Sequence, residues 1–337
     1  MVLIPKSPMR FLVIGLGSAG QRHARVIRSL FPSATIDAYI GAHHTGLIAE
    51  DLKSVDYTVT PMDFYGLNQV KALDGIRDKY DLTVIATPIN SHFEYFDKTK
   101  EISKRFIIEK PIGNSVSESE KILGFAMSYN LPVLIGYQQS FNPLVRTILD
   151  CCRSRDLPNS IQITFHEYLR SMNPFRDMST HHLANEGGGG VLLALSHELD
   201  ILLQIRKIDI TKLRIELGKS NEFHNVIDYA SITLNSLVST NLSPEIKVSL
   251  SFSQGEKERR GQIEWQDQAL IWNFLTGEVT FKDKAMKSNV LVPKMSGDQL
   301  FAMQLLFLLN KSSFDNDLFE RLNRAINIVR INESALN

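Results

Sequence analysis

Three glycines with the spacing Gly-x-Gly-x-x-Gly follow the first apolar run of the chain. The segment reads RFLVIGLGSAG, and its glycines are Gly15, Gly17 and Gly20. In a strand–turn–helix context the first permits a tight turn, the second lets a pyrophosphate approach the backbone, and the third lets helix and strand pack closely. Ser18 and Ala19 would open the helix, whose free N–H groups attract phosphate oxygens. The spacing predicts a dinucleotide-binding turn; a glycine-rich turn that binds nothing is the alternative.

Strand-like and helix-like segments alternate through the first 145 residues. Apolar runs occur at residues 34–40, 81–88, 104–111 and 131–138, and helical patterns such as 117–130 lie between them. This alternation predicts a parallel, doubly wound sheet. We therefore expect a Rossmann domain over residues 1–145.

The pattern changes from about residue 146. Apolar and polar residues alternate at 161–169, 212–220, 228–237, 246–254 and 261–274. Successive strands of this kind predict an antiparallel sheet with one exposed face. The fold class expected is therefore α/β + α+β, in which a second domain of residues 146–337 carries a large, mostly antiparallel open sheet plus helices. One helix is expected at 189–205, and the last helix is expected to pack back on the first domain.

Charge and cysteine content exclude several classes of protein. Lys plus Arg number 37 and so do Asp plus Glu, which argues against broad electrostatic binding of nucleic acid or of an anionic membrane. The adjacent Cys151 and Cys152 are badly placed for a structural disulfide and are expected to be free thiols in a reducing compartment. No apolar run has the length of a membrane span, and the first residues lack a secretory pattern. A cytoplasmic protein is expected.

The end of the second strand bears on the choice of dinucleotide. A carboxylate there binds the adenosine ribose 2′-hydroxyl, whereas a small or basic residue tolerates a 2′-phosphate. In IDAYIGAHH this position falls on Gly41, with Asp37 earlier in the strand and His43 and His44 just beyond. Without a repelling carboxylate at Gly41, the sequence favours NADP over NAD. The alternative is that His43 and His44 are merely solvated loop residues.

Further motifs accompany the glycine turn. The chain has VIATPINSH at 84–92, EKP at 109–111 and SHELD at 196–200. Together, over nearly the whole chain, they resemble the glucose–fructose oxidoreductase / inositol dehydrogenase / MocA (Gfo/Idh/MocA) family. The resemblance implies an NAD(P)-dependent oxidoreductase that acts on a CH–OH group or keto carbon of a sugar or sugar derivative. HEYL at 166–169 and the segment 251–265 resemble members linked to surface-polysaccharide sugar metabolism.

The resemblance also implies roles for single residues. Lys110 matches the active-site lysine of the family, and Pro111 matches a proline whose bond to that lysine is often cis. His197 and Asp200 match an H-x-x-D pattern on the substrate side. A strand end that lines the nicotinamide is matched by Thr87, Pro88 and His92.

The predicted site residues fall into three groups. Proton transfer is assigned to Lys110 and His197, supported by Asp200, Pro111 and Glu109. Substrate binding is assigned to Lys110, His197 and Tyr168. The residues expected to bind the cofactor are Gly15, Gly17, Ser18, Ala19, Gly20, Gly41, His43, Thr87, Pro88, His92, Glu109 and Lys110.

Hydride transfer explains why a lysine is expected at this position. The alcohol proton must leave while the forming carbonyl is polarised. Lys110 follows a strand, where doubly wound sheets bind ligands, and burial beside a positive nicotinamide would lower its pKa. Glu109 should face the other side of the strand and have a structural role. An ordinary surface lysine is the alternative.

The histidine motif carries a second expectation. Asp200, one helical turn after His197, could accept a hydrogen bond from its Nδ1 and fix the tautomer. A histidine satisfied within the core is the alternative. No carboxylate or cysteine is spaced to complete a metal site with His181, His182 and His197, so no metal is predicted.

Two departures from the family pattern favour a rival class. Ala194 stands where the family has an acidic residue one turn before the histidine, and Ser140 stands where it has an arginine. The rival is a non-catalytic dinucleotide- or sugar-nucleotide-binding protein of the same fold.

Two surfaces complete the expectations. One face of the second sheet is expected to be apolar and uncovered, which predicts a homodimer or homotetramer built on it. Arg22, Arg25 and Arg28 on the first helix are expected to form a solvated face, from which Arg22 could reach a phosphate.

Overall fold

The computed structural model describes residues 8–41, 46–76, 79–172, 174, 190–219, 226–234, 244–252, 255–284 and 286–336. The chain divides into two units. The first comprises Met1–Gln138, Asn173–Phe175 and Ser296–Arg330, and the second comprises Gln139–Met172, Arg176–Met295 and Ile331–Asn337. Residues 296–330 thus belong with the N-terminal unit although they follow the second unit in sequence.

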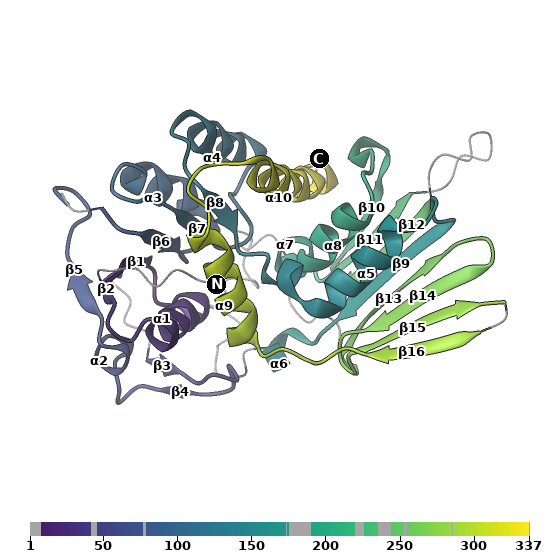
Figure 1. Ribbon diagram of the computed structural model, residues 1–337, viewed down its shortest axis with the longest axis horizontal. Helices are drawn as coiled ribbons and strands as arrows, with labels where there is room; N and C mark the ends of the chain where they lie inside the picture. The colour runs from purple at the N-terminus through teal and green to yellow at the C-terminus, as the bar shows by residue number, and fades with distance from the viewer. Residues whose placement is uncertain are drawn as a thin grey trace. The chain divides into compact units, whose positions relative to one another are not determined.

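A six-stranded sheet forms the centre of the first unit (Figure 1), with the order β5-β2-β1-β6-β7-β8. All five neighbouring pairs are parallel. This confirms the predicted doubly wound sheet. The strands are β1 (Arg10–Ile14), β2 (Thr35–Tyr39), β5 (Asn68–Val70), β6 (Leu82–Ile85), β7 (Phe106–Ile108) and β8 (Val133–Ile135).

Helices alternate with these strands along the chain. The central strands β6 and β7 are buried along their whole length, as expected for a parallel sheet covered on both faces. A capping box at Ser296 and Gln299 begins α9, which packs against α1. The further elements are α1 (Ser18–Leu30), the short pair β3 (Leu47–Ile48) and β4 (Val55–Asp56), α2 (Pro61–Tyr65), η1 (Ile89–Ser91), α3 (His92–Thr99), α4 (Val116–Ser128), α9 (Gly297–Leu309) and α10 (Asn316–Leu336).

An eight-stranded sheet forms the second unit, with the order β10-β11-β12-β9-β13-β14-β15-β16. Every pair is antiparallel except β12 with β9, so the predicted mostly antiparallel sheet is confirmed. The strands are β9 (Ser160–His166), β10 (Arg214–Gly218), β11 (Tyr229–Leu234), β12 (Glu245–Ser251), β13 (Glu258–Glu264), β14 (Gln268–Asn273), β15 (Glu278–Asp283) and β16 (Lys287–Leu291).

The helix expected at 189–205 is two helices. They are α7 (Gly190–Ala194) and α8 (His197–Ile205), and the break falls at Ser196, whose buried hydroxyl donates to the Leu193 carbonyl. α7 packs on β11 and β12, and α8 packs on β9 and on α5 (Pro143–Arg153). The short elements η2 (Gln138–Phe141), α6 (Leu169–Met172) and η5 (Ile210–Lys212) complete the described chain.

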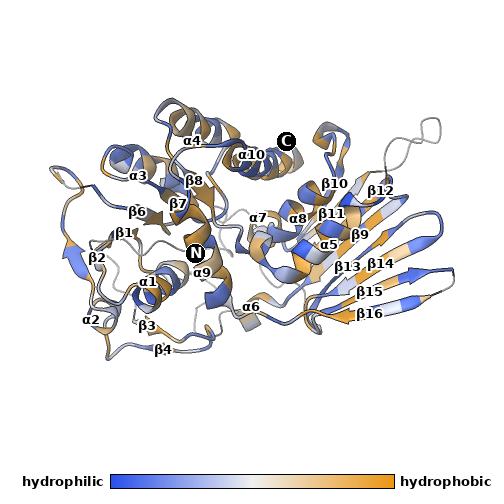
Figure 2. Ribbon diagram, viewed as in Figure 1, coloured by the Kyte–Doolittle hydropathy of each residue, from blue (hydrophilic) through white to orange (hydrophobic). Residues whose placement is uncertain are grey.

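The uncovered face of this sheet is polar, so the expected apolar face is wrong. On β9, Ile161, Ile163 and Phe165 are buried, while Gln162 between them is exposed. The same alternation on the neighbouring strands adds exposed Lys247 and Arg260 beside other polar side chains, and Figure 2 shows the alternating hydropathy. Alternate residues of a strand face opposite sides of the sheet. The apolar residues here face the covering helices, and the polar residues face solvent.

Two features are absent from the described residues. None of the helices there has the length and apolar character needed to cross a membrane. The same residues hold no group of three or more His, Cys, Asp or Glu side chains suited to a metal ion. His181 and His182, which the sequence analysis considered as metal ligands, lie outside the described residues.

Candidate active site

The glycine turn joins β1 to α1 and has the geometry that a pyrophosphate requires. Gly15 has φ +89, and a Cβ there would lie 2.6 Å from the Ala86 carbonyl oxygen. A Cβ on Gly20 would lie 1.9 Å from the Gly15 oxygen. Gly17 is the N-cap residue of α1, and no side chain caps the helix there. The N-terminus of α1 lies directly after this turn, where backbone N–H groups and the helix dipole favour phosphate oxygens, so these residues fit the predicted dinucleotide.

Gln21 ties this turn to the segment that precedes β3. The side chain is 1% exposed; its Nε2 donates to the Leu16 and Gly46 carbonyls at 3.0 and 2.9 Å, and its Oε1 accepts from Ile48 N at 2.8 Å. Sequence reasoning missed Gln21. The available signal was a polar residue three positions before Ala24, on the buried face of α1.

The end of β2 carries no carboxylate. Asp37 lies within the strand, is 7% exposed, and accepts hydrogen bonds from Tyr80 Oη, Asn68 Nδ2 and Arg10 Nη2. Gly41 is exposed, and a Cβ there would meet nothing within 4 Å. His43 lies outside the described residues. The Asp37 carboxylate is thus occupied by hydrogen bonds within the first unit, and the position of Gly41 has room for a side chain.

Three strands of the first unit end in one row. Ile14, Ile85 and Ile108 are register partners across β1, β6 and β7. Because parallel strands share one carboxyl edge, the residues that follow this row, the glycine turn, Ala86–Thr87 and Glu109–Lys110, lie along the same edge. This edge brings together the predicted cofactor turn and the predicted catalytic lysine.

His92 is a buried residue that contacts the backbone of two segments at this edge. The ring is 1% exposed, with Nε2 2.9 Å from the Thr87 carbonyl oxygen and Nδ1 3.0 Å from the Pro111 carbonyl oxygen. Burial lowers the pKa of His92, because it disfavours the charged ring. Thr87 is partly exposed and Pro88 is exposed. His92 therefore supports the strand end from the interior, whereas it was expected to line the nicotinamide.

Lys110 follows β7 directly. It is half-buried, Pro111 is buried, and the bond between them is cis, as the resemblance implied. The preceding Glu109 donates its backbone N–H to the Ile85 carbonyl, which fixes the start of the turn to β6.

The carboxylate of Glu109 is hydrogen-bonded to a residue of α1. Its Oε1 accepts from Nε2 of His23 on α1 at 2.8 Å, and His23 is 1% exposed. The structural role expected for Glu109 thus has a specific partner. Sequence reasoning missed His23, which reads as an ordinary helix residue three positions after Gly20.

In the second unit, His197 is the first residue of α8 and is 9% exposed. The hydrogen bond expected between its Nδ1 and Asp200 is wrong, since within the described part of the chain that nitrogen makes no hydrogen bond. Asp200 Oδ2 accepts instead from Ser140 Oγ at 2.6 Å and from Gln204 Nε2 at 2.8 Å. Gln204, one turn further along α8, and the short Ser140 are both within reach of this carboxylate.

The remaining predicted residues of the second unit lie apart from this network. Ala194 ends α7 and is 6% exposed, so an acidic side chain there would be buried and would need its own partner. Tyr168 is half-buried before α6, and its carbonyl accepts from the backbone N–H and the hydroxyl of Ser171.

The three arginines of α1 do not form a solvated face, so that expectation is wrong. Arg25 makes a bidentate bond to Asp298 of α9 at 2.6 and 2.7 Å, which raises the pKa of Arg25. Arg22 also pairs with Asp298, at 3.3 Å. Arg28 donates to backbone carbonyls, including those of Tyr65 and Gly66. The arginines hold α9 and the segment after α2 on α1.

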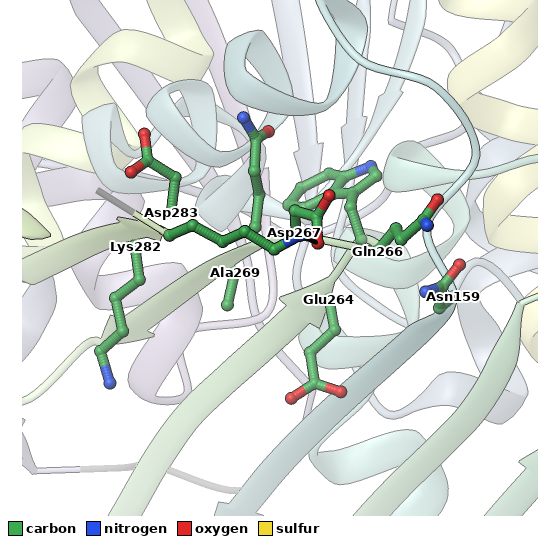
Figure 3. A pocket seen from close by; sticks show the side chains of 10 residues that line it. Asn159, Glu264, Gln266, Asp267, Ala269, Lys282 and Asp283 are labelled. Atoms are coloured by element: carbon green, nitrogen blue, oxygen red, sulfur yellow. Dashed lines mark ion pairs between the residues drawn. The ribbon is translucent and has the colours of Figure 1, made fainter. Parts of the chain in front are cut away.

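A hollow of about 560 Å³ lies in the second unit, at the turn between β13 and β14 and along β15 (Figure 3). Its side chains include Trp265 and the ion pair of Lys284 with Asp267, at 2.5 Å. No predicted site residue lines it. The hollow is therefore not assigned to the predicted chemistry.

Comparisons with known proteins agree with the geometry of the first unit. Residues 9–137 match the model of an oxidoreductase family with an NAD-binding Rossmann fold, Gfo/Idh/MocA. A D-xylose 1-dehydrogenase (NADP(+)) of Haloarcula marismortui is 24% identical over 147 residues, which are 43% of this chain and 39% of that protein. The rhizopine catabolism protein MocA of Rhizobium meliloti is 26% identical over 217 residues, 63% of this chain and 61% of that protein. Each alignment covers less than two thirds of the relative's length.

The fold extends over both units in solved structures. UDP-N-acetylglucosamine 3-dehydrogenase GnnA from Acidithiobacillus ferrooxidans superposes with a TM-score of 0.73 and 19% identity, covering 98% of this chain and 100% of that chain. At this identity the likeness concerns the fold alone. The family match covers the dinucleotide-binding part of the first unit: residues 9–137 are similar to the Gfo/Idh/MocA family of oxidoreductases with an NAD-binding Rossmann fold.

Proposed function

We propose that this protein is an NAD(P)-dependent oxidoreductase that exchanges a hydride between the nicotinamide and a hydroxyl or keto carbon of a sugar or sugar derivative. The observation that carries the proposal is the alignment of Ile14, Ile85 and Ile108 at the ends of three neighbouring parallel strands. The glycine turn follows the first of these residues and Lys110 follows closely after the last, so both lie at the same edge of the sheet. A turn suited to a pyrophosphate and an amine suited to proton transfer are the two parts that this chemistry needs.

In this mechanism the bound cofactor supplies or accepts the hydride. Gly15, Gly17 and Gly20 would hold the pyrophosphate at the N-terminus of α1. Lys110 takes the proton of the alcohol during oxidation and returns it during reduction. Lys110 is half-buried directly after β7.

His197 has a second role in proton transfer under the same proposal. Support comes from the H-x-x-D pattern and from its position as the first residue of α8. Asp200 supports α8 through Ser140 and Gln204, and so acts on His197 only indirectly.

For the cofactor, we infer that NADP(H) binds at least as tightly as NAD(H). Gly41 offers no carboxylate to repel a 2′-phosphate, and Asp37 is occupied by three partners within the sheet. The relative from Haloarcula marismortui, whose name includes NADP(+), supports the same choice.

The substrate class is tested by turnover. Purified protein with NADP or NAD is offered a panel of sugars, inositols and UDP-sugars, and formation of the reduced nicotinamide is followed by absorbance. The segments 166–169 and 251–265 motivate the surface-polysaccharide sugars on the panel. Turnover of at least one member supports the proposal. Tight cofactor binding without turnover across the whole panel would refute it in favour of a binding protein.

That rival, a non-catalytic dinucleotide- or sugar-nucleotide-binding protein, has two observations behind it. The Ser140 hydroxyl donates its hydrogen bond to Asp200, and Ala194 is buried and has no carboxylate. Neither residue belongs to the Lys110 edge, which is why oxidoreduction remains the stronger candidate.

Assembly and location complete the proposal. A homodimer or homotetramer through the eight-stranded sheet would need a polar interface, because exposed Gln162, Lys247 and Arg260 lie on its free face. Light scattering at micromolar concentration tests it, and a stable monomer would contradict it. A cytoplasmic location is proposed from the unpaired cysteines and the balanced charge.

A further inference from the structure

Two buried histidines contact the residues on either side of Lys110 in the chain. His23 of α1 holds the side chain of Glu109, and His92 of α3 contacts the carbonyl oxygen of Pro111. Both rings are 1% exposed, and the proposed mechanism uses neither. The residues immediately before and after the proposed catalytic lysine are therefore both held from the interior.

The Glu109 carboxylate is confined on the side of α1 and β8. A Cβ on Gly136, after β8, would lie 2.7 Å from Glu109 Oε2, so the carboxylate fills the space that a side chain would take there. The His23 ring packs against the ring of Phe301 on α9, with the ring centroids 4.6 Å apart and the planes tilted by 51°, and this contact helps to hold the ring that bonds Oε1. The Glu109 side chain is 12% exposed. Its orientation is thus set by packing as well as by the bond to His23.

The orientation of the Glu109 carboxylate affects Lys110 because the carboxylate is negatively charged. A carboxylate close to an amine stabilises the ammonium form and raises its pKa, which removes the free base that alcohol oxidation needs. The His23 bond draws the Glu109 carboxylate toward α1. Among the described residues, Arg22, which is paired with Asp298, and His92 also interact electrostatically with Glu109.

We propose that His23 is a positioning residue for the proton transfer by Lys110. By holding the Glu109 carboxylate against α1 and Gly136, it fixes the turn that carries Lys110 and keeps that carboxylate from pairing with the amine. This inference rests on the proposed function for the role of Lys110. It assigns His23 no contact with substrate or cofactor.

The test compares His23→Ala, Glu109→Gln and the double variant. His23→Ala frees a charged carboxylate, so the acid limb of the pH profile of kcat for alcohol oxidation should move up by about half a pH unit or more. The rate at neutral pH should fall about tenfold through the displaced turn. Glu109→Gln carries no charge, so it should not move the limb upward. The double variant should return the limb to the wild-type position.

A conservative variant guards against misfolding. His23→Gln keeps an N–H donor close to the Nε2 position and should recover most of the rate that His23→Ala loses. Cofactor affinity, measured by fluorescence titration, should stay within about twofold in His23→Ala and His23→Gln, because the glycine turn is unchanged. If the acid limb of the pH profile moved up equally in His23→Ala and in the double variant, the proposal would be overturned.

A readout without turnover separates this inference from the proposed function. The Lys110 amine is titrated directly by its pH-dependent rate of acylation, with mass spectrometry to identify the site and the other lysines as internal reference. His23→Ala should raise the pH at which Lys110 becomes reactive, whether or not any sugar is oxidised. An unmoved titration in a folded, active variant would overturn the positioning role alone. Lack of turnover by the wild type would overturn the proposed function alone.

Discussion

The hydroxyl of Ser140 donates to the carboxylate of Asp200 across 2.6 Å, and this bond joins η2 to α8. Since the acceptor is charged, Ser140→Ala should lower the free energy of unfolding by about 1–2 kcal/mol in urea denaturation. Ser140→Thr keeps the hydroxyl and is the matched control. Asp200→Asn should destabilise the protein without moving the pH profile of activity. A shift of that profile would mean that Asp200 acts on His197 after all.

The pair of Arg25 and Asp298 should contribute more to stability than exposed ion pairs do. Their side chains are only 19% and 22% exposed, and the bond is bidentate. Asp298→Asn should lower the free energy of unfolding by about 1–2 kcal/mol. Glu94→Gln, which breaks the exposed pair with Lys98, is the control and should change the free energy of unfolding much less than Asp298→Asn does. Equal effects in urea denaturation would contradict the role of Asp298 in holding α9 on α1.

Gly41 offers a direct test of cofactor preference. A Cβ there meets nothing within 4 Å, so Gly41→Asp adds a carboxylate without a clash. It should weaken NADP(H) relative to NAD(H) by at least about tenfold, or about 1.4 kcal/mol. Gly41→Ala is the neutral control and should leave the ratio unchanged. A wild-type preference of tenfold for NAD(H) in fluorescence titration would contradict the NADP assignment.

Buried His92 predicts a dependence of stability on pH. Burial lowers its pKa from the ordinary 6.5, so the unfolded chain binds the proton more readily than the folded one. The stability that the neutral ring provides is therefore complete above about pH 6.5 and is lost as pH falls toward the lowered pKa. His92→Gln should flatten the loss of stability between about pH 7 and pH 5 in urea denaturation. His166, whose pKa is also lowered by burial, acts in the same direction, so His166→Asn is measured in parallel. An unchanged slope in His92→Gln would contradict the account.

The local patterns of the first unit were sufficient to predict its fold. The spacing of Gly15, Gly17 and Gly20 after an apolar run predicts the turn, since backbone sterics leave few alternatives. The cis bond before Pro111 followed only from the family resemblance. Both depend on residues that are close together in the sequence.

Partners that are far apart in the sequence could not be predicted. Glu109 is bonded to His23, 86 positions earlier, and Asp200 is bonded to Ser140, 60 positions earlier. Period-two alternation showed that the second sheet has two kinds of face, but not that its free face is polar. Arg25 read as a solvated residue because its partner Asp298 lies on a helix from the far end of the sequence.

The central claim is that Lys110 performs the proton transfer while the glycine turn holds the cofactor. The most direct measurement is the turnover rate of Lys110→Met, with cofactor affinity determined on the same preparation. Methionine keeps the length and the apolar stem but removes the amine. The account predicts that kcat falls by roughly 10²- to 10⁴-fold while the Kd for the cofactor stays nearly unchanged. If Lys110→Met kept more than about a tenth of the wild-type kcat, the amine would not be the transferring group, and the claim would be contradicted.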